Sequence, residues 1–331
     1  MTDQTTGNVV VDDFKTTSFF GSFFRARLHI GYIAYPYLIF GFLVHWSLLG
    51  FQPEELSKSA WWRFSLGSLI AFLYTPFIFI VNDYFDAPYD ALDKKKRERN
   101  PFCYENVRKS SLIKILVFLP GALSLILSFL IGWEAGIVSA IATFLGVFYS
   151  ARPLRFKEVA ILDLIVHGFC LGVFFFSLGF FSFWRENYNP FIEPLFILLV
   201  FFAFLDGAWI QIDSQMIDYE SDKLSNQKTS TVQLGPKKSV LLLRMIILGM
   251  LSTLPLFFIL NGAFSHKYGS NTALVIALIL LVLPSSYLAL TLGGESKFQR
   301  IRHISSRFRV YTVYSFALVI IILSFPGIYA E

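Results

Sequence analysis

The sequence has few charged residues. Asp, Glu, Lys and Arg together make up 15% of its 331 residues, whereas soluble globular domains carry about 25%. The residues that take their place are apolar: 55% are hydrophobic, Phe alone occurs 38 times, and the mean hydropathy is +0.59. The shortage of charge excludes an ordinary soluble domain and predicts a membrane protein.

Cysteine is also scarce. The two cysteines, Cys103 and Cys170, are far apart, and neither a Cys-x-x-Cys pair nor a Cys/His ligand spacing is present. The sequence therefore predicts neither a disulfide framework nor a zinc site. The five histidines are scattered, and we expect them to be structural or interfacial.

The chain has a net charge of +5 and a pI near 9.1. Such a basic balance also occurs in proteins that bind nucleic acid. Here the Lys and Arg residues are confined to loops between apolar runs, which is the pattern that orients a protein in a bilayer. We therefore expect the lipid bilayer, and no nucleic acid, as a partner.

Long apolar runs dominate the sequence, and a membrane-spanning helix needs about 20 apolar residues. Nine runs are candidates: His29–Leu49, Trp61–Val81, Leu112–Gly132, Ala135–Phe148, Ile161–Phe183, Phe191–Trp209, Val240–Leu260, Thr272–Leu292 and Tyr311–Ile328. Residues 1–21 are polar and mixed, without the apolar core of a cleaved signal peptide. The sequence predicts an all-α, polytopic membrane protein. A cytoplasmic lead over residues 1–27 precedes a single domain of nine transmembrane helices over residues 28–331.

The distribution of charge predicts an orientation. If the N-terminus lies in the cytoplasm, nine spans place 24 of the 28 Lys and Arg residues on the cytoplasmic side. The other four fall on the opposite side: Lys58, Arg63, Arg185 and Lys267. Cytoplasmic loops carry an excess of Lys and Arg. This asymmetry favours nine spans with the N-terminus inside and the C-terminus outside.

An acidic cluster follows the second apolar run. Asn82 and Asp86 are four residues apart and share one helical face, and Asp83 lies about one turn before Asp86. Pro88 lacks an amide proton and disfavours a helix, so we expect Asp90 on a loop. Carboxylates at the end of an apolar helix are costly near lipid, which favours a site facing the interior of a bundle. Oxygen ligands of this kind suit Mg²⁺.

A second acidic cluster follows the sixth run. Four polar residues fall at i, i+4, i+7 and i+11 and form one stripe on a helix: Gln211, Gln215, Asp218 and Asp222. Asp206 and Asp213 form another stripe, turned partly away from the first. The two clusters are four helices apart, which suggests a weak internal duplication. With the N-terminus inside, both clusters lie at the cytoplasmic face.

Basic residues occur near both clusters. They comprise the run Lys94–Arg99, then Arg152, Arg155 and Lys157, and finally Lys223 and Lys228. Two sets of carboxylates at one surface can hold two Mg²⁺ ions about a diphosphate, while Lys and Arg neutralise its remaining oxygens. Such clamps stabilise the charge on a departing phosphate group, as ionisation of an allylic diphosphate requires. An interior rich in Phe and Tyr would shelter an isoprenoid tail and stabilise a carbocation.

The motifs occur in a characteristic order. The sequence reads Asn82-Asp83-x-x-Asp86-x-x-x-Asp90, then Arg99-Asn100-Pro101, then Tyr149-Ser150 with Pro153-Leu154-Arg155-Phe156-Lys157, then Asp218-x-x-x-Asp222 with Lys228-Thr229 and Leu234-Gly235. This combination resembles the UbiA superfamily of intramembrane prenyltransferases. The resemblance implies nine transmembrane helices around a central cavity. In that cavity the Asp motifs bind Mg²⁺ and a prenyl diphosphate donor, assisted by a loop Tyr and a basic residue.

The resemblance also implies roles for individual residues. Six side chains are predicted to hold Mg²⁺: Asn82, Asp83, Asp86, Asp90, Asp218 and Asp222. Four residues are predicted to act in catalysis: Asp86, Asp218, Tyr149 and Lys157. Seven are predicted to bind substrate: Asn82, Arg97, Arg99, Arg155, Gln211, Gln215 and Lys228. The sequence does not decide which basic residue of the loop contacts the diphosphate. Arg152, Arg155 and Lys157 are all candidates, because the spacing here is longer than in the family.

Other residues within the apolar runs have structural interpretations. Asp163 and His167 are four residues apart on the fifth run, where we expect a polar contact inside the bundle. Asp206 either supports the site or forms a hydrogen bond between packed helices. The Phe runs 174–176 and 180–181 are expected to face lipid.

Three functions compete for this sequence. The first is transfer of a prenyl group to a lipophilic acceptor, which the resemblance leaves open among quinone precursors, chlorins, haem, glycerol lipids and carotenoids. The second is a membrane terpene cyclase, in which a double bond of the same chain is the acceptor. The third is a cation-coupled transporter, whose acidic residues would be expected nearer the bilayer midplane. Donor chain length and oligomeric state are left open.

Overall fold

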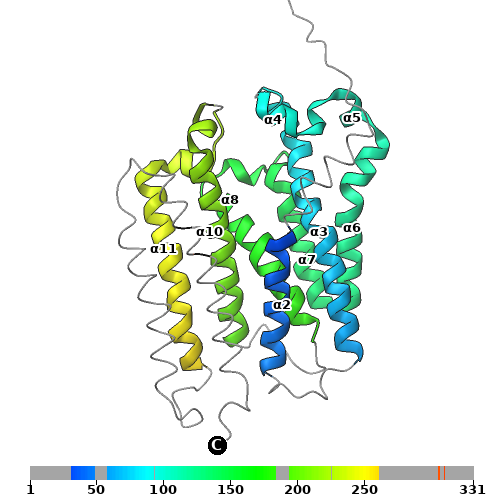
Figure 1. The fold of residues 1–331 in the computed structure, drawn as a ribbon, viewed down its shortest axis with the longest axis vertical. Coiled ribbons are helices and arrows are strands. Elements are labelled where there is room, and N and C mark those ends of the chain that lie inside the picture. The colour runs from blue at the N-terminus through cyan, green and yellow to red at the C-terminus, as the bar shows by residue number, and fades with distance from the viewer. Residues whose placement is uncertain are drawn as a thin grey trace, which may run out of the picture.

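The protein is built from helices (Figure 1). The computed structural model describes residues 31–48, 58–92, 94–183, 194–224 and 226–260, together with residues 305 and 309. The regular elements within these ranges are all helical, which confirms the all-α prediction. Five helices are long and apolar enough to cross a membrane: Ala60–Asp90, Ser111–Ile131, Trp133–Ser150, Leu162–Phe181 and Pro194–Leu224.

Seven of the nine predicted runs fall largely within the described residues and are helical there. Six correspond to α2 (Gly31–Leu48), α3 (Lys58–Asp90), α6 (Ser111–Ile131), α7 (Trp133–Ser150), α10 (Pro194–Leu224) and α11 (Ser230–Leu260). The fifth run is composite and comprises α8 (Leu162–His167), the π-helical segment η4 (Gly168–Val173) and α9 (Phe174–Phe181). The eighth and ninth runs, 272–292 and 311–328, lie outside the described residues.

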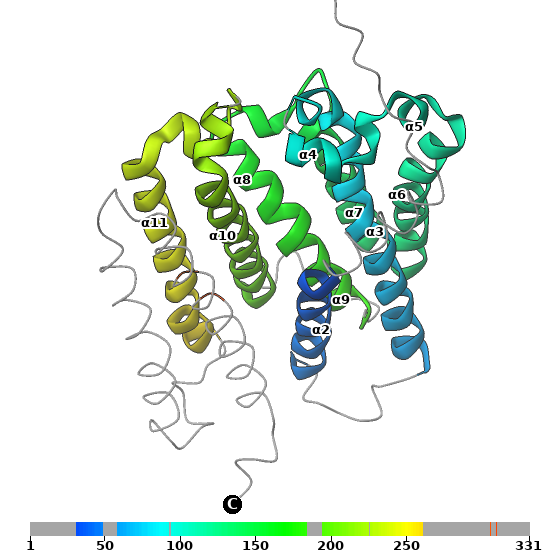
Figure 2. The same ribbon diagram turned by 45° about the horizontal axis from the view of Figure 1, so that its top comes forward.

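Short helices connect the long ones at one end of the molecule. These are α4 (Lys94–Arg99), η2 (Pro101–Cys103) and α5 (Glu105–Lys109) between α3 and α6, and η3 (Phe156–Glu158) between α7 and α8. Figure 1 shows α10 and α11 on one side, α3, α6 and α7 on the other, and α2 and α8 between them. The turned view in Figure 2 keeps α4 and α5 at the same end as the start of α8.

Helix α3 continues well beyond its apolar run and carries the first acidic cluster. It ends at Asp90, so the expected loop at this residue is wrong. Pro88 lies in the last turn, where its missing amide removes a single helical hydrogen bond. The amide of Ala91 still donates to the carbonyl of Ala87 at 3.0 Å, which completes the turn. Asp90 therefore shares a helical face with Asp86, four residues before it, and with Asn82.

Helices α10 and α11 also differ from their apolar runs. The sixth run ends at Trp209, but α10 continues to Leu224 and includes the whole polar stripe. Helix α11 begins at Ser230, ahead of its apolar run, and is interrupted at Gly235, whose φ of 75° is left-handed. Glycine adopts this conformation without a Cβ clash. The polar ends of α3, α10 and α11 therefore extend the bundle beyond its apolar part.

Glycines allow the central helices to approach closely. A Cβ at Gly179 of α9 would lie 1.9 Å from the carbonyl oxygen of Leu38 on α2. A Cβ at Gly172 of η4 would lie 1.9 Å from the carbonyl oxygen of Ala203 on α10. Small residues at such crossings let helix backbones pack against each other inside a membrane. The composite helix is thus fixed between α2 and α10.

The Phe-rich part of the composite helix is buried. The five side chains of Phe174, Phe175, Phe176, Phe180 and Phe181 are 0–1% exposed. The expectation that they face lipid is wrong, because α9 and η4 are covered by α2, α7 and α10. Of the described spans, Leu162–Phe181 is the most enclosed, with 83% of its apolar window buried, against 28% for Ser111–Ile131.

Candidate active site

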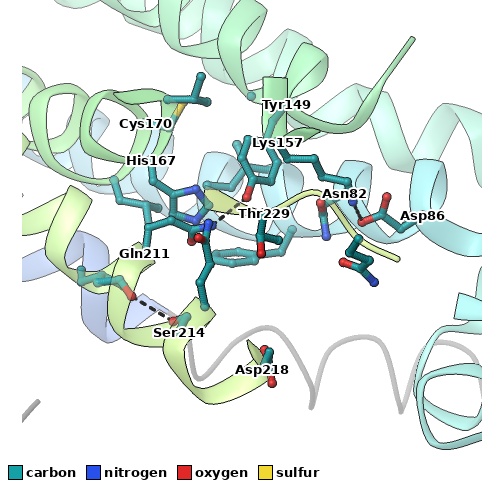
Figure 3. A pocket seen from close by; sticks show the side chains of 18 of the residues that line it. Asn82, Asp86, Tyr149, Lys157, His167, Cys170, Gln211, Ser214, Asp218 and Thr229 are labelled. Atoms are coloured by element: carbon teal, nitrogen blue, oxygen red, sulfur yellow. Dashed lines mark hydrogen bonds and ion pairs between the residues drawn. The ribbon is translucent and has the colours of Figure 1, made fainter. Parts of the chain in front are cut away.

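A cavity of about 510 Å³ lies between α3 and α7 on one side and α10 on the other. This volume is typical of small-molecule sites. Nine predicted site residues line it: Asn82, Asp86, Asp90, Tyr149, Lys157, Gln211, Gln215, Asp218 and Asp222. Figure 3 shows Asn82 and Asp86 on one side of the cavity and Gln211 and Asp218 on the other. The fold therefore brings the two acidic clusters to one cavity.

Asp86 of the first cluster is paired with two cations. Its side chain is buried; Arg155 Nη2 lies 3.2 Å from Oδ1, and Lys157 Nζ forms an ion pair with Oδ2. Burial lowers the pKa of Lys157, and the negative charge of Asp86 opposes this shift. Each carboxylate oxygen of Asp86 is therefore paired with a cationic side chain.

The loop from α7 to α8 supplies both cations. Arg155 also donates through Nη1 to the carbonyl of Ser150 at 3.0 Å. This hydrogen bond fixes the guanidinium group of Arg155, which does not line the cavity. Lys157 lines the cavity itself. Arg152 is exposed and donates to the hydroxyl of Tyr89 at 3.1 Å. Of the three bases that the sequence leaves open, Lys157 is the one that lines the cavity.

Asn100 organises the rest of the first cluster. Its Nδ2 donates to Asp90 Oδ2 and to the carbonyl of Asp83, both at 2.8 Å. The Asn100 side chain is buried, and its Oδ1 accepts from the amide of Phe102 at 3.0 Å. The connection after α4 is therefore fastened to the end of α3. Deeper in the cavity, the hydroxyl of Ser150 donates to Asn82 Oδ1 at 2.5 Å.

The second cluster is held more loosely. Asp218 is exposed, whereas Asp222 is buried. Lys96 Nζ lies 3.8 Å from Asp222 Oδ1, and the Thr229 hydroxyl donates to Oδ2 at 3.4 Å. Lys96 belongs to α4, so this ion pair links the connection after α3 to α10 across the cavity.

Tyr149 is positioned by two cavity residues. Gln211 Nε2 donates to its hydroxyl at 2.8 Å. The ring of His167 meets the Tyr149 ring edge to face, with 5.1 Å between centroids. Figure 3 shows these side chains gathered on the α8 and α10 side of the site. The phenol is thereby fixed at the boundary between the polar and apolar parts of the cavity.

Asp163 joins three helices behind the second cluster. It is fully buried and accepts from the Ser230 amide at 2.9 Å, from the Ser230 hydroxyl, and from Gln215 Nε2 at 2.6 Å. Gln215 Oε1 in turn accepts from the Thr231 amide at 3.1 Å. The expected contact between Asp163 and His167 is wrong, because the carboxylate is directed to the N-terminus of α11. Gln215 lines the cavity but uses its amide for this structural link.

Asp206 and Asp213 face away from the cavity. Both carboxylate oxygens of Asp206 accept from Arg309 Nη1, at 2.8 and 3.1 Å. Asp213 Oδ1 accepts from the Ser305 hydroxyl at 2.9 Å, and Trp209 Nε1 donates to the same hydroxyl at 2.7 Å. Of the two roles weighed for Asp206, the structure supports the contact between packed segments.

Some predicted residues lie outside the cavity, and others that line it were missed. Five predicted residues do not line it: Asp83 is half-buried, Arg155 is buried against Asp86, and Arg97, Arg99 and Lys228 are exposed. Six further polar residues line the cavity that were not assigned individually to the site: Lys96, His167, Cys170, Ser214, Gln227 and Thr229. The basic run did signal a cation after α3, but successive helical residues point about 100° apart. The run alone could not show that Lys96 faces inward.

Known proteins resemble this chain in sequence. The sequence matches the UbiA prenyltransferase family over residues 43–306. Digeranylgeranylglyceryl phosphate synthase of Saccharolobus solfataricus is 28% identical over 271 residues, which cover 78% of this chain and 86% of that protein. Lycopene elongase/hydratase of Haloarcula japonica is 39% identical over 93 residues, which cover 28% of this chain and 30% of that protein.

Solved structures share the fold. A digeranylgeranylglyceryl phosphate synthase in membranes matches with a TM-score of 0.66 at 15% identity, covering 92% of this chain and 99% of that one. A UbiA homologue from Archaeoglobus fulgidus, bound to GPP and Mg²⁺, matches with a TM-score of 0.56 at 20% identity, covering 89% and 99%. Since the family match extends over most of the sequence, the chain belongs to the UbiA prenyltransferase family and is a multi-pass membrane prenyltransferase.

Proposed function

We propose that this protein moves a prenyl group from an isoprenoid diphosphate to a lipophilic acceptor, with Mg²⁺ holding the diphosphate. One observation carries the proposal: two carboxylate clusters face a single cavity, Asp86 and Asp90 from α3 and Asp218 and Asp222 from α10. The homologue from Archaeoglobus fulgidus, which is bound to GPP and Mg²⁺, supports it.

The donor set of the cavity fits Mg²⁺. Each cluster presents two carboxylates, and the first adds the amide of Asn82. Mg²⁺ usually takes one or two carboxylates and completes its shell with water and substrate phosphates. Within the described ranges, no three His, Cys, Asp or Glu side chains form a closed metal-binding group. We therefore assign Asp86 and Asp90 to one ion and Asp218 and Asp222 to a second, each shared with the diphosphate.

The cations of the cavity would bind the same diphosphate. When bound, Mg²⁺ would stabilise the negative charge that develops as the bond between the prenyl C1 and the diphosphate breaks. Lys157 and Lys96 each contact a carboxylate of one cluster, so their ammonium groups lie within the site and can neutralise phosphate oxygens. The diphosphate leaves with the bonding electron pair, C1 bonds to the acceptor, and the acceptor loses a proton.

Tyr149 is placed to act on the prenyl cation. Its hydroxyl is held by Gln211, and the residue lines the cavity between the acids and the apolar part. An aromatic face within a few ångströms of a cation stabilises it, more strongly when water is excluded. We assign this role to Tyr149, and the role of orienting Tyr149 to Gln211.

We further propose a glycerol lipid as the acceptor. Three relatives that cover 61–78% of this chain are digeranylgeranylglyceryl phosphate synthases. The match to the lycopene elongase/hydratase covers 28% of the chain. Purified protein in detergent should consume geranylgeranyl diphosphate with Mg²⁺ only when a monoprenylated glyceryl phosphate is added. Diphosphate release that depends instead on a carotenoid acceptor would reject this assignment.

One assay separates transfer from the alternatives. With the prenyl diphosphate as the single substrate, a transferase releases little diphosphate, whereas a terpene cyclase converts the donor into a cyclic product. Uptake into proteoliposomes without consumption of the donor would support a transporter, which family membership disfavours. Mass spectrometry of the lipid products identifies the outcome directly.

We also propose that residues 28–331 form one domain of nine spans after a cytoplasmic lead at 1–27, with the active site at the cytoplasmic face. The segregation of Lys and Arg supports this topology. In a background without native cysteines, single cysteines within 94–109 should react with a membrane-impermeant reagent only from the cytoplasmic side. Cysteines at Ser57 or Ser265 should react only from the other side, and a reversed pattern would overturn the topology.

A further inference from the structure

Positions along α3 and α7 show how far each lining residue lies from the acidic end of the cavity. Near the acids, the Ser150 hydroxyl donates to Asn82 Oδ1 at 2.5 Å. One turn deeper, four residues earlier on each helix, Gly146 lies against Ile78, and both residues line the cavity. The two helices thus run side by side in register, with their polar ends at the same level.

Below Gly146 the interior is filled. Tyr74 and Ala142, a further turn back on α3 and α7, are both 0% exposed. The Tyr74 ring packs on Phe174 with 4.3 Å between centroids, and the Cys170 thiol donates to the carbonyl of Ala142 at 3.4 Å. Cys170 still lines the cavity, and Figure 3 shows it at the end of the site opposite to Asp86. Among the described residues, the wall that α3, α7 and η4 contribute to the apolar part of the cavity therefore ends at the level of Gly146 and Cys170.

Position 146 has close neighbours at this end of the cavity. A Cβ added there would lie 3.1 Å from Ile78 Cγ2, 3.4 Å from the Tyr74 hydroxyl and 4.0 Å from Cys170 Sγ. The tightest of these contacts is to the Cγ2 methyl of Ile78, which is bonded directly to Cβ of a residue that is stiff at χ1 in a helix, so a side chain at 146 requires α3 or α7 to shift by a few tenths of an ångström. Atoms beyond the Cβ have to extend into the cavity, because Tyr74 closes the space behind.

We propose that Gly146 sets the length of the prenyl chain that the donor can carry. The inference rests on the proposed function, in which the diphosphate lies between the acidic clusters. Its chain then follows the apolar side of the cavity away from Asp86, towards Ile78 eight residues earlier on α3. Eight helical residues span about 12 Å at 1.5 Å each. The glycine leaves the end of this path open to the terminal carbons of the chain, and a side chain there closes it.

Binding of donor analogues of different length tests this proposal without an acceptor. The probes are non-hydrolysable thiodiphosphates with prenyl chains of about 10, 15 and 20 carbons, titrated with Mg²⁺ against the full-length protein by calorimetry. We expect Gly146→Val to bind the longest probe at least about tenfold more weakly relative to the shortest, compared with wild type. Gly146→Ala should change the ratio in the same direction by less.

A compensating variant distinguishes lost space from general damage. Ile78→Ala removes the side chain that a Cβ at position 146 would meet first. In the Gly146→Val background it should restore binding of the longest probe. The control is Gly249→Val on α11, where a Cβ would lie 3.0 Å from Leu205 outside the cavity. It should lower the melting temperature without altering the ratio of affinities.

The outcomes are distinct. Equal weakening of all three probes by Gly146→Val, an unchanged ratio, or failure of Ile78→Ala to restore the longest probe overturns the role of Gly146. If Gly146→Val does not fold, the ratio measured for Gly146→Ala decides. A wild-type protein that binds none of the probes overturns the proposed function, and this inference with it.

Discussion

The two acidic clusters face one cavity but are neutralised differently. Asp86 is held by Arg155 at 3.2 Å and by an ion pair with Lys157, both from the connection between α7 and α8. Asp222 meets Lys96 at 3.8 Å, from the connection between α3 and α6. The first cluster is therefore organised by cations on its own side of the cavity, and the second by a contact that crosses it.

The difference indicates which side of the site moves. A lysine that spans the cavity has to release Asp222 before a diphosphate can enter between the clusters, whereas Arg155 can keep its contact with Asp86 throughout. Because α4 is fastened to α3 through Asn100, its movement is confined to a short connection. We expect the site to close over the diphosphate at the second cluster, and the first cluster to hold the diphosphate in position.

The largest expected effect comes from removing one acid of each cluster. Asp86→Ala and Asp218→Ala should each lower diphosphate release by about a thousandfold, since each removes a metal ligand. Only Asp86→Ala should also lower the melting temperature, because it leaves the ammonium group of Lys157 without its ion pair, at a cost of roughly 3 kcal/mol, whereas Arg155 keeps its ion pair with Glu158. Asp218 is exposed and has no such role. Equal melting temperatures for the two variants would refute the comparison.

The two cavity lysines should give smaller, unequal effects. Lys157→Met should reduce turnover strongly, because its ammonium group lies beside Asp86 at the fixed cluster. Lys96→Met should mainly raise the KM for the donor, by about tenfold, and increase the share of prenyl alcohol formed when water enters. Hydrogen exchange supplies the second measurement: protection within 94–109 should rise on adding Mg²⁺ and a thiodiphosphate, and protection at 155–158 should change little. The reverse order of protection would place closure at the first cluster.

A third pair of variants tests the support behind the second cluster. Asp163→Asn removes an acceptor from the start of α11 and should loosen Thr229, which donates to Asp222. We expect a rise of a few fold in donor KM and a loss of about 1–3 kcal/mol in stability. Asp206→Asn is the matched control, because its partner Arg309 lies away from the cavity. Asp206→Asn should lower stability without changing the KM for the donor. If it raised KM as much as Asp163→Asn does, both variants would act by destabilising the fold and not by loosening the second cluster.

The smallest expected effect is on the rate of alkylation of Cys103, which reports on the first cluster alone. Burial raises the pKa of its thiol to about 11, with a further contribution from the charges of Asp90 and Asp83. At pH 8 the thiol is therefore protonated and alkylation by iodoacetamide should be slow, accelerating only as the pH approaches 11. Mg²⁺ at the cluster would offset the negative charge, lower this pKa and speed alkylation several fold. An unchanged rate would argue against metal near Asp90, and Cys103→Ser gives the background from Cys170, which is 4% exposed.

Local sequence patterns were sufficient to predict much of the fold and much of the candidate site. Each apolar run within the described residues is helical, because membrane helices depend on lengths of continuous hydrophobic sequence, although α3, α10 and α11 extend beyond their runs. The acids line the cavity because residues spaced four apart share a helical face. The error at Asp90 has a local cause as well: a proline in the last helical turn costs one hydrogen bond, and the helix continues through it.

Tertiary contacts account for what the sequence could not predict. Asp163 meets Ser230 across 67 positions, so its spacing to His167 carried no information about its partner. The buried Phe residues of α9 have the composition of a lipid-facing surface, and they are enclosed by close helix crossings such as those at Gly41, Gly172 and Gly179. Gly146 likewise has no signal in one sequence, because its significance depends on the two helices that face it.

The link between Asp163 and the start of α11 bears on how the chain is made. The span Leu162–Phe181 leaves the ribosome before the segments that carry Gln215 and Ser230, which supply the hydrogen-bonding partners of Asp163. An unpartnered carboxylate costs about 2.5–3.5 kcal/mol on insertion scales at the centre of a membrane helix, and Asp163 lies in the first turn of its span, where the cost is lower. The nascent span therefore carries an unsatisfied acid until the helices that enclose it arrive. Chains truncated before residue 230 should consequently be recognised by membrane quality control and degraded faster than chains that extend past the first turn of α11.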